Sequence, residues 1–157
     1  MKNPMDRQLA KSLSDRAVAI GREGEASAFE ELLEMLNCPD PNVRRLSASA
    51  LGKLAWLGVD QERAVAALAP LVRKDPHDQT RQYAIKALKA YGAVSAEWIH
   101  DLRDIARNPG LKDYIRRDAT AAADFIEEAV RRKEASKEHR CLRCHATVTA
   151  EEYARAQ

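Results

Sequence analysis

The sequence predicts an all-α fold, a right-handed α-solenoid in which three helical pairs stack behind an N-terminal cap helix. A short segment that opens an apolar helix occurs three times, and its arginines Arg44, Arg81 and Arg116 are 37 and 35 residues apart. A period in this range is typical of stacked helical pairs. The chain is also 45% hydrophobic but only 5% aromatic, a balance that suits small, closely packed helices with solvated outer faces.

The first two helices are predicted from their end signals and their apolar spacing. Asn3 and Pro4 have the residue types of an N-cap and a first helical position. Gly21 and Gly24 are expected to end this helix. A second helix is predicted over residues 26–37, where apolar residues recur at helical spacing.

The rest of the chain repeats a cycle of outer helix, turn and inner helix. Inner helices are predicted over residues 42–57, 80–91 and 112–130. Ser95 is the expected N-cap of the third outer helix. Alanines occupy one equivalent position of the three inner helices: Ala50, Ala87 and Ala122. Small residues at that position are expected to let neighbouring inner helices approach closely.

A resemblance to a known family is strongest in the first unit. The matching residues are the turn Asp40-Pro41, the pair Val43-Arg44 and the run from Ala48 to Gly52. These residues resemble the HEAT-repeat family, including its short bacterial form, the phycobilisome-lyase-like repeats, and the resemblance covers residues 26–130. In that family a repeated arginine and a turn aspartate form a ladder along the stack. The resemblance therefore implies a ladder that contains Arg44, Arg81 and Arg116, with Asp40 as its clearest acid.

The chain divides by composition into residues 1–135, a HEAT-like repeat domain, and residues 136–157, a cysteine-containing tail with a short helix. The net charge of +2 names no partner by itself. No apolar stretch has the length of a membrane span, and the first 21 residues lack the pattern of a secretory signal. We therefore expect a cytoplasmic protein whose thiols stay reduced.

The tail contains a candidate metal site in which Cys141 and Cys144 have the Cys-x-x-Cys spacing. Two thiolates at this spacing can both reach one tetrahedral Zn²⁺. His139 or His145 is the expected third ligand, and the fourth position is expected to be open or supplied by a second copy of the chain or by a partner. The sequence thus predicts zinc as a cofactor, with a monomer or a metal-linked dimer as the oligomeric state.

Two other interpretations of the tail stay open. The cysteines can be ordinary reduced thiols without a ligand. Cys-x-x-Cys-His is also the attachment signature of haem c, in which His145 would be an axial ligand. Haem attachment normally takes place outside the cytoplasm, so the sequence favours zinc over haem.

The leading functional prediction is a non-catalytic scaffold, because repeat solenoids provide extended binding surfaces. The sequence contains no Ser/His/Asp set, no paired catalytic carboxylates and no phosphate-binding glycine loop, so we predict that the protein is not an enzyme. Another protein is expected to bind the concave face formed by the inner helices. Its expected contact residues are polar positions of these helices: Ser49, Lys53, Gln82, Lys86 and Lys89.

The alternative prediction is a nucleic-acid-binding module that uses the basic tail and an arginine edge, which is the stripe expected from the pairs Arg44-Arg45 and Arg116-Arg117 along one edge of the stack. Residues 131–145 contain six lysines and arginines against two glutamates, a charge balance that suits phosphate contacts. The expected contacts are Arg131, Arg132, Lys137 and Arg140. A solvated helix end is the plainer interpretation of the same charges. For the two tryptophans, Trp56 and Trp98, partly buried packing is favoured over exposed anchoring of a partner.

Overall fold

The computed structural model describes the backbone of residues 6–155 and the side chains of residues 6–137. Within these ranges the chain forms helices and turns and no β-strand. The α-helices are α1 (Arg7–Glu23), α2 (Phe29–Met35), α3 (Pro41–Leu54), α4 (Gln61–Lys74), α5 (Asp78–Ala90), α6 (Ile99–Arg107) and α7 (Asp113–Arg155). Short 3₁₀ turns connect some of them: η1 (Ala26–Ala28), η2 (Ala55–Leu57) and η3 (Gly92–Trp98).

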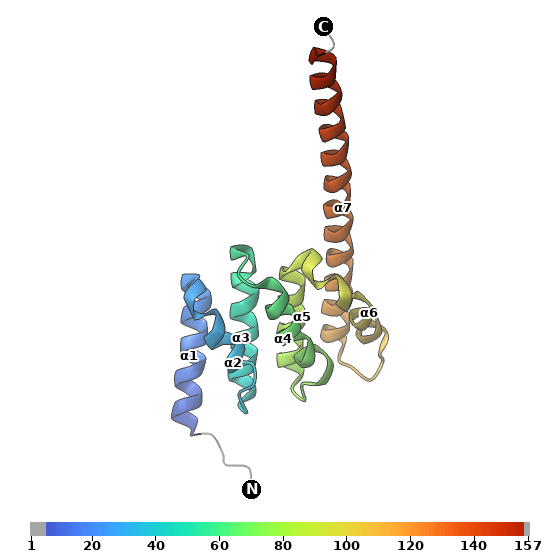
Figure 1. Ribbon diagram of the computed structural model, residues 1–157. Helices are drawn as coiled ribbons and strands as arrows, with labels where there is room; N and C mark the ends of the chain where they lie inside the picture. Colours follow the sequence, from blue (N-terminus) through green and yellow to red (C-terminus); the bar gives the residue numbers. More distant parts are fainter. Residues whose placement is uncertain (1–5, 156–157) are drawn as a thin grey trace.

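The helices form two layers that follow the order of the chain. Helices α1, α3, α5 and α7 are neighbours in one layer, which we call the inner layer (Figure 1). Helices α2, α4 and α6 form the outer layer, where each packs against the inner helix that follows it. The fold is therefore the predicted solenoid of three HEAT-like helical pairs, with α1 as its N-terminal cap helix.

Helix ends follow the predicted chemistry in some places and depart from it in others. Asp40 is the N-cap of α3, since its Oδ1 accepts hydrogen bonds from the backbone N–H groups of Asn42 and Val43 at 2.8 and 3.1 Å. Helix α1 begins at Arg7 with Asp6 as its N-cap, and Gly24 ends it with a positive φ of 69°. The predicted start at residues 3 and 4 lies outside the described residues.

The prediction that Ser95 caps the third outer helix is wrong. Ser95 is buried inside η3, and its hydroxyl donates to the carbonyl oxygen of Leu88 at 2.8 Å. Trp98 occupies the N-cap position of α6 without a side-chain cap. The serine therefore fastens η3 to the end of α5, because a buried hydroxyl needs a hydrogen-bond partner.

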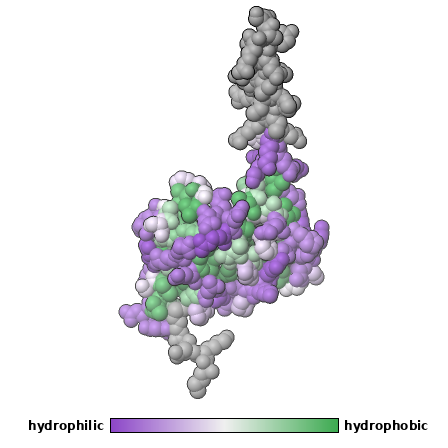
Figure 2. All heavy atoms as spheres, viewed as in Figure 1, coloured by the Kyte–Doolittle hydropathy of each residue, from purple (hydrophilic) through white to green (hydrophobic). Residues whose placement is uncertain are grey.

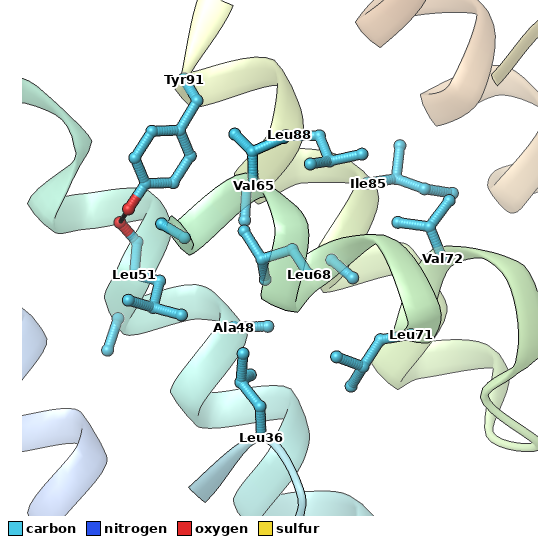
Figure 3. Close-up of a cluster of buried hydrophobic side chains, with 14 of the residues drawn as sticks. Leu36, Ala48, Leu51, Val65, Leu68, Leu71, Val72, Ile85, Leu88 and Tyr91 are labelled. Atoms are coloured by element: carbon cyan, nitrogen blue, oxygen red, sulfur yellow. Dashed lines mark hydrogen bonds between the residues drawn. The ribbon is translucent and has the colours of Figure 1, made fainter. Parts of the chain in front are cut away.

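The hydrophobic core lies between the two layers (Figure 3). Leu51 of α3 and Leu88 of α5 are fully buried in it. Tyr91 closes this cluster, and its phenolic O–H donates to the carbonyl oxygen of Leu51 at 3.0 Å. Elsewhere, hydrophilic residues cover much of the packed helices, and hydrophobic residues show between them (Figure 2). The apolar stripes of the helices are thus buried by stacking.

Inner helices approach each other where residues are smallest. A Cβ added to Gly21 of α1 would lie 3.0 Å from the Cα of Ala50 in α3. A Cβ added to Gly52 of α3 would lie 3.2 Å from the Cα of Ala87 in α5. The prediction that Gly21 ends this helix is wrong, because α1 continues to Glu23. Gly21 instead forms part of the contact of α1 with α3. The prediction of close approach at Ala50 and Ala87 is confirmed, and glycine provides the opposite side of each contact.

The first prediction tests this contact with Gly21→Ala. Helix propensity alone would raise the free energy of unfolding by about 1 kcal/mol. We expect instead a fall of about 1–2 kcal/mol, because the new methyl group must push α1 away from α3. Urea denaturation measures the change, and Ala66→Gly at an exposed position of α4 calibrates the propensity effect in this chain. A stabilised Gly21→Ala variant would contradict the close contact.

The second prediction concerns Tyr91. Burial of its side chain raises the pKa of the phenol from 10.0 to about 12. The folded state holds the phenolic proton more tightly than the unfolded chain does. The contribution of Tyr91 to stability is therefore complete below pH 10 and is lost as the pH rises through 12. Two pKa units correspond to about 2–3 kcal/mol. Between pH 10 and 12 the free energy of unfolding should fall less steeply in Tyr91→Phe than in the wild type, and equal slopes would refute the assignment.

Candidate partner-binding face

One side of α3, α5 and α7 gathers polar, cationic and aromatic side chains, and we call it the inner face. Most of its residues recur at spacings of three, four or seven along each helix, which places them on one side of that helix. The inner face consists of Arg45, Ser49 and Lys53 of α3, Gln82, Tyr83, Lys86 and Lys89 of α5, and Asp118 and Phe125 of α7.

Three of the five predicted contact residues line one groove between α3 and α5. Ser49, Lys53 and Lys86 surround a hollow of about 190 Å³ together with Tyr83. The other lining residues are small: Ala48, Gly52, Ala87 and Ala90. Ala48 and Ala87 are buried whereas both lysines are exposed, so the groove has an apolar base and a cationic rim.

The other two predicted residues, Gln82 and Lys89, contact α7. The side-chain amide of Gln82 donates to Oδ2 of Asp118 at 2.6 Å. The ammonium nitrogen of Lys86 lies 3.8 Å from the same oxygen. The ammonium nitrogen of Lys89 lies 5.4 Å from the centroid of the Phe125 ring, within the range of a cation–π contact. The structure therefore brings all five residues onto one continuous surface.

Positive charge on the inner face is poorly neutralised. Within the described residues no carboxylate forms an ion pair with Lys53 or Lys89, and the pair of Lys86 with Asp118 is long at 3.8 Å. The guanidinium of Arg45 donates to the neutral side chain of Asn42 at 2.6 Å. Each of these cations therefore retains hydrogen-bonding capacity for an external anion.

The outer layer differs, because three of its arginines form ion pairs with carboxylates of other helices. Arg63 of α4 contacts Glu30 of α2 at 2.6 Å, and this pairing lowers the pKa of Glu30 and raises that of Arg63. Arg73 contacts Asp101 of α6 at 2.7 Å, and Arg103 contacts two carboxylates of α7. Much of the outer positive charge is thus matched within the protein.

The edge formed by the turns contains one strong ion pair. Arg44 donates from Nε and Nη2 to the two carboxylate oxygens of Asp75 at 2.7 and 3.1 Å, and from Nη1 to the carbonyls of Cys38 and Pro39. Both side chains are largely buried. A bidentate pair of this kind fixes orientation as well as adding energy. The acid that pairs with Arg44 is therefore Asp75 of the next turn, and the implied place of Asp40 in the ladder is wrong.

The other two ladder arginines have different partners. Arg81 donates to the backbone carbonyl of Val72 at 3.1 Å. Arg116 pairs with Asp113 within the first turn of α7. Only Arg44, among the three, joins consecutive turns through a carboxylate in the described part of the chain. The arginines implied by the resemblance lie at the turn edge, but they do not form a continuous ladder of ion pairs.

The residues of the nucleic-acid alternative lie on α7, whose C-terminal part extends away from the stacked helices (Figure 1). Arg131 and Arg132 are exposed, and both pair with Glu128 at 3.3 and 2.9 Å. Lys137 is exposed as well. Arg140 lies outside the residues whose side chains are described.

The candidate zinc ligands also lie outside those residues: His139, Cys141, Cys144 and His145. Over residues 6–137, no group of three or more His, Cys, Asp or Glu side chains is arranged to hold a metal ion. The division of the chain at residue 135 and the zinc site both stay predictions.

The two tryptophans differ in their environment. Trp98 is half-buried and its ring lies under the guanidinium of Arg73, with 4.6 Å from Cζ to the ring centroid. The prediction of packing is confirmed for Trp98. It is wrong for Trp56, whose exposed fraction is 79%. Trp56 lies in η2, directly after α3, where the turn carries its side chain into solvent.

Four inner-face residues were not predicted from the sequence: Arg45, Tyr83, Asp118 and Phe125. Asp118 and Phe125 are seven residues apart on α7, and this spacing would have placed both on one stripe. Tyr83 is half-buried beneath Arg45 and Lys86, whose charged groups lie 5.1 and 5.4 Å from its ring centroid. Helical spacing alone therefore contained a signal for the missed residues on α7.

Within residues 6–155, no helix is both long enough and apolar enough to cross a membrane.

Comparisons with known proteins agree with the architecture. A search of curated proteins and a search of solved structures each gave no match. Residues 16–89 match the family model described as HEAT repeats. This match runs from the middle of α1 to the end of α5 and supports the HEAT-repeat family for the segment that contains the α3–α5 groove.

Proposed function

We infer that this protein is a non-catalytic scaffold that binds another protein through its inner face. The observation that carries the proposal is the contrast in charge between the layers. Arg63 and Arg73 of the outer layer are matched by carboxylates of neighbouring helices, whereas Lys53 and Lys89 of the inner face are not. The ring of Phe125 is half-exposed beside these charges. Unmatched charge next to accessible aromatic surface favours recognition of a partner.

Binding is a better fit than catalysis for this surface. The α3–α5 groove of about 190 Å³ is smaller than the usual 300–1,000 Å³ of a small-molecule pocket. Its lysines line an open hollow, and no histidine or carboxylate contributes to its lining. HEAT-like stacks present extended surfaces of this kind to macromolecules.

The third prediction is that the variant Lys53→Glu/Lys86→Glu/Lys89→Glu loses its protein partner while it stays folded. All three side chains project from the inner face, and Lys53 and Lys86 are exposed. Reversing three charges should weaken binding by about tenfold or more, since rim charges set both attraction and repulsion. Affinity capture from the native cell extract, with quantitative mass spectrometry, measures the loss of proteins that the wild type retains.

A matched control is Lys74→Glu/Arg107→Glu/Lys133→Glu, which makes the same change in net charge. These side chains are exposed and lie at the ends of α4 and α6 and on the side of α7 that faces η3. The control should retain the captured partner. If the inner-face variant also retains it, the assignment of the inner face fails.

The fourth prediction tests the nucleic-acid alternative, which is supported by the exposure of Arg131 and Arg132 on α7. A protein that uses Arg131, Arg132, Lys137 and Arg140 should bind duplex DNA or RNA with an affinity that falls steeply as salt increases. Replacing the four by glutamine should flatten that slope. We expect no binding in 50 mM salt, and a steep slope that this variant loses would favour the alternative.

The fifth prediction concerns a zinc ion in the tail, which we propose from the Cys-x-x-Cys spacing and the adjacent histidines. Cys141 and Cys144 would be its thiolate ligands, with His139 or His145 as the third. Elemental analysis of natively purified protein should find zinc that Cys141→Ser/Cys144→Ser lacks. Melting of the helical stack should change little, because the core residues of the described part of the chain precede the tail, with Ile126 the last that is fully buried. Stoichiometric zinc in the double variant, or an absorption spectrum of haem in the wild type, would contradict the site.

A further inference from the structure

The α3–α5 groove limits the chemistry of what can occupy it. Its base is apolar, because Ala48 and Ala87 are buried there and Gly52 adds no side chain. The volume of about 190 Å³ is below that of ordinary ligand pockets. This volume suits one apolar side chain of a larger partner, in the manner of an interface anchor.

The cationic rim of the groove favours an occupant that carries negative charge. Lys53 and Lys86 both line the groove and both are exposed. Lys53 has no ion pair among the described residues, and the only carboxylate near Lys86 is Asp118, at 3.8 Å. Each ammonium group has three N–H donors, so carboxylates of a bound chain would find donors on both sides of the anchor.

The aromatic rings of the inner face favour a polypeptide over a nucleic acid. Single strands bind without sequence preference by stacking bases on accessible aromatic rings. The ring of Tyr83 is half-buried, and Arg45 and Lys86 lie over it. Lys89 lies over the ring of Phe125. Cations of the protein itself thus cover Tyr83, and the inner face offers no row of accessible rings, since only Phe125 is half-exposed.

We propose that the partner presents an acidic segment in which one apolar side chain enters the α3–α5 groove while flanking carboxylates pair with Lys53 and Lys86. This inference rests on the proposed function and specifies its partner class. Charge complementarity places the segment across the boundary between α3 and α5. The small residues of the groove limit the anchor to a single side chain.

The test uses isotope-labelled full-length protein and a capped pentapeptide in which one leucine is flanked by two glutamates on each side. Chemical shifts should change first at Ser49, Gly52, Lys53 and Lys86. A peptide with glutamine in place of glutamate should bind about tenfold more weakly, as expected for the loss of two exposed ion pairs. A peptide with alanine in place of leucine should also bind more weakly, because it leaves the groove unfilled.

Two protein variants test the groove separately from its charge. Ala90→Met should fill the groove from an exposed position and weaken peptide binding, whereas Ala66→Met, on exposed α4 surface, should not. The variant Lys53→Gln/Lys86→Gln should bind the glutamate peptide more weakly than the wild type does and bind the glutamine peptide with unchanged affinity. Circular dichroism checks that each variant retains the helix content of the wild type.

Three outcomes would overturn the proposal: equal binding of the glutamate and glutamine peptides, shift changes confined to other surfaces, or tighter binding of a 15-nucleotide oligothymidylate at the same residues. The glutamate peptide can fail to bind while the inner-face charge reversal still abolishes partner capture. That result would reject the acidic segment as the partner and leave the proposed scaffold function in place. Partner capture that survives the charge reversal would reject the scaffold assignment itself.

Discussion

Close contact between inner helices is the constraint on which the rest of this structure depends. At Gly21 against Ala50, and again at Gly52 against Ala87, the backbones come so near that one added methyl group would crowd the facing Cα. Contacts of this kind hold α1, α3 and α5 in one layer. Once that layer forms, the larger apolar residues of α2, α4 and α6 can be buried against it. Figure 3 shows this for Val65, Leu68 and Val72 of α4.

The same contact creates the candidate binding surface. Because Gly52 lets α3 and α5 approach, a shallow groove with a base of small residues remains between longer side chains on either side. Lys53 and Lys86 line this groove. The residues that allow the helices to pack thus also determine where an external side chain can enter, and packing and recognition share one feature.

Most of the fold could be predicted from the sequence because its causes are local and repeated. Apolar spacing, turn prolines and the equivalent alanines Ala50 and Ala87 each recur from unit to unit. The failures arose where a residue type serves two purposes. Serine is both a good N-cap and a residue that can be buried once its hydroxyl is bonded, and in Ser95 the second use prevails. Asp40 likewise serves as a cap, so the ion pair with Arg44 falls to Asp75.

The candidate site was predictable in part. Polar positions of the inner helices could be assigned from helical spacing, and all five lie on the inner face. The contacts that give this face its charge could not be predicted, since they depend on which side chains of different helices meet. Whether a lysine is neutralised is decided by contacts such as that of Lys86 with Asp118, across 32 residues of sequence. The exposure of Trp56 depends in the same way on how η2 leaves α3.

Positive charge is poorly neutralised on the inner face, whereas the arginines Arg63, Arg73 and Arg103 of the outer layer are matched by carboxylates. Paramagnetic relaxation by small cosolutes of opposite charge tests it directly, because their local concentrations follow the surface potential at each residue. At Ser49, Lys53 and Lys89 the anionic cosolute should cause the stronger relaxation. Around Glu30 and Arg63 the two cosolutes should cause nearly equal relaxation, or the cationic cosolute should cause the stronger relaxation. Equal relaxation by both cosolutes on the inner face would contradict the account.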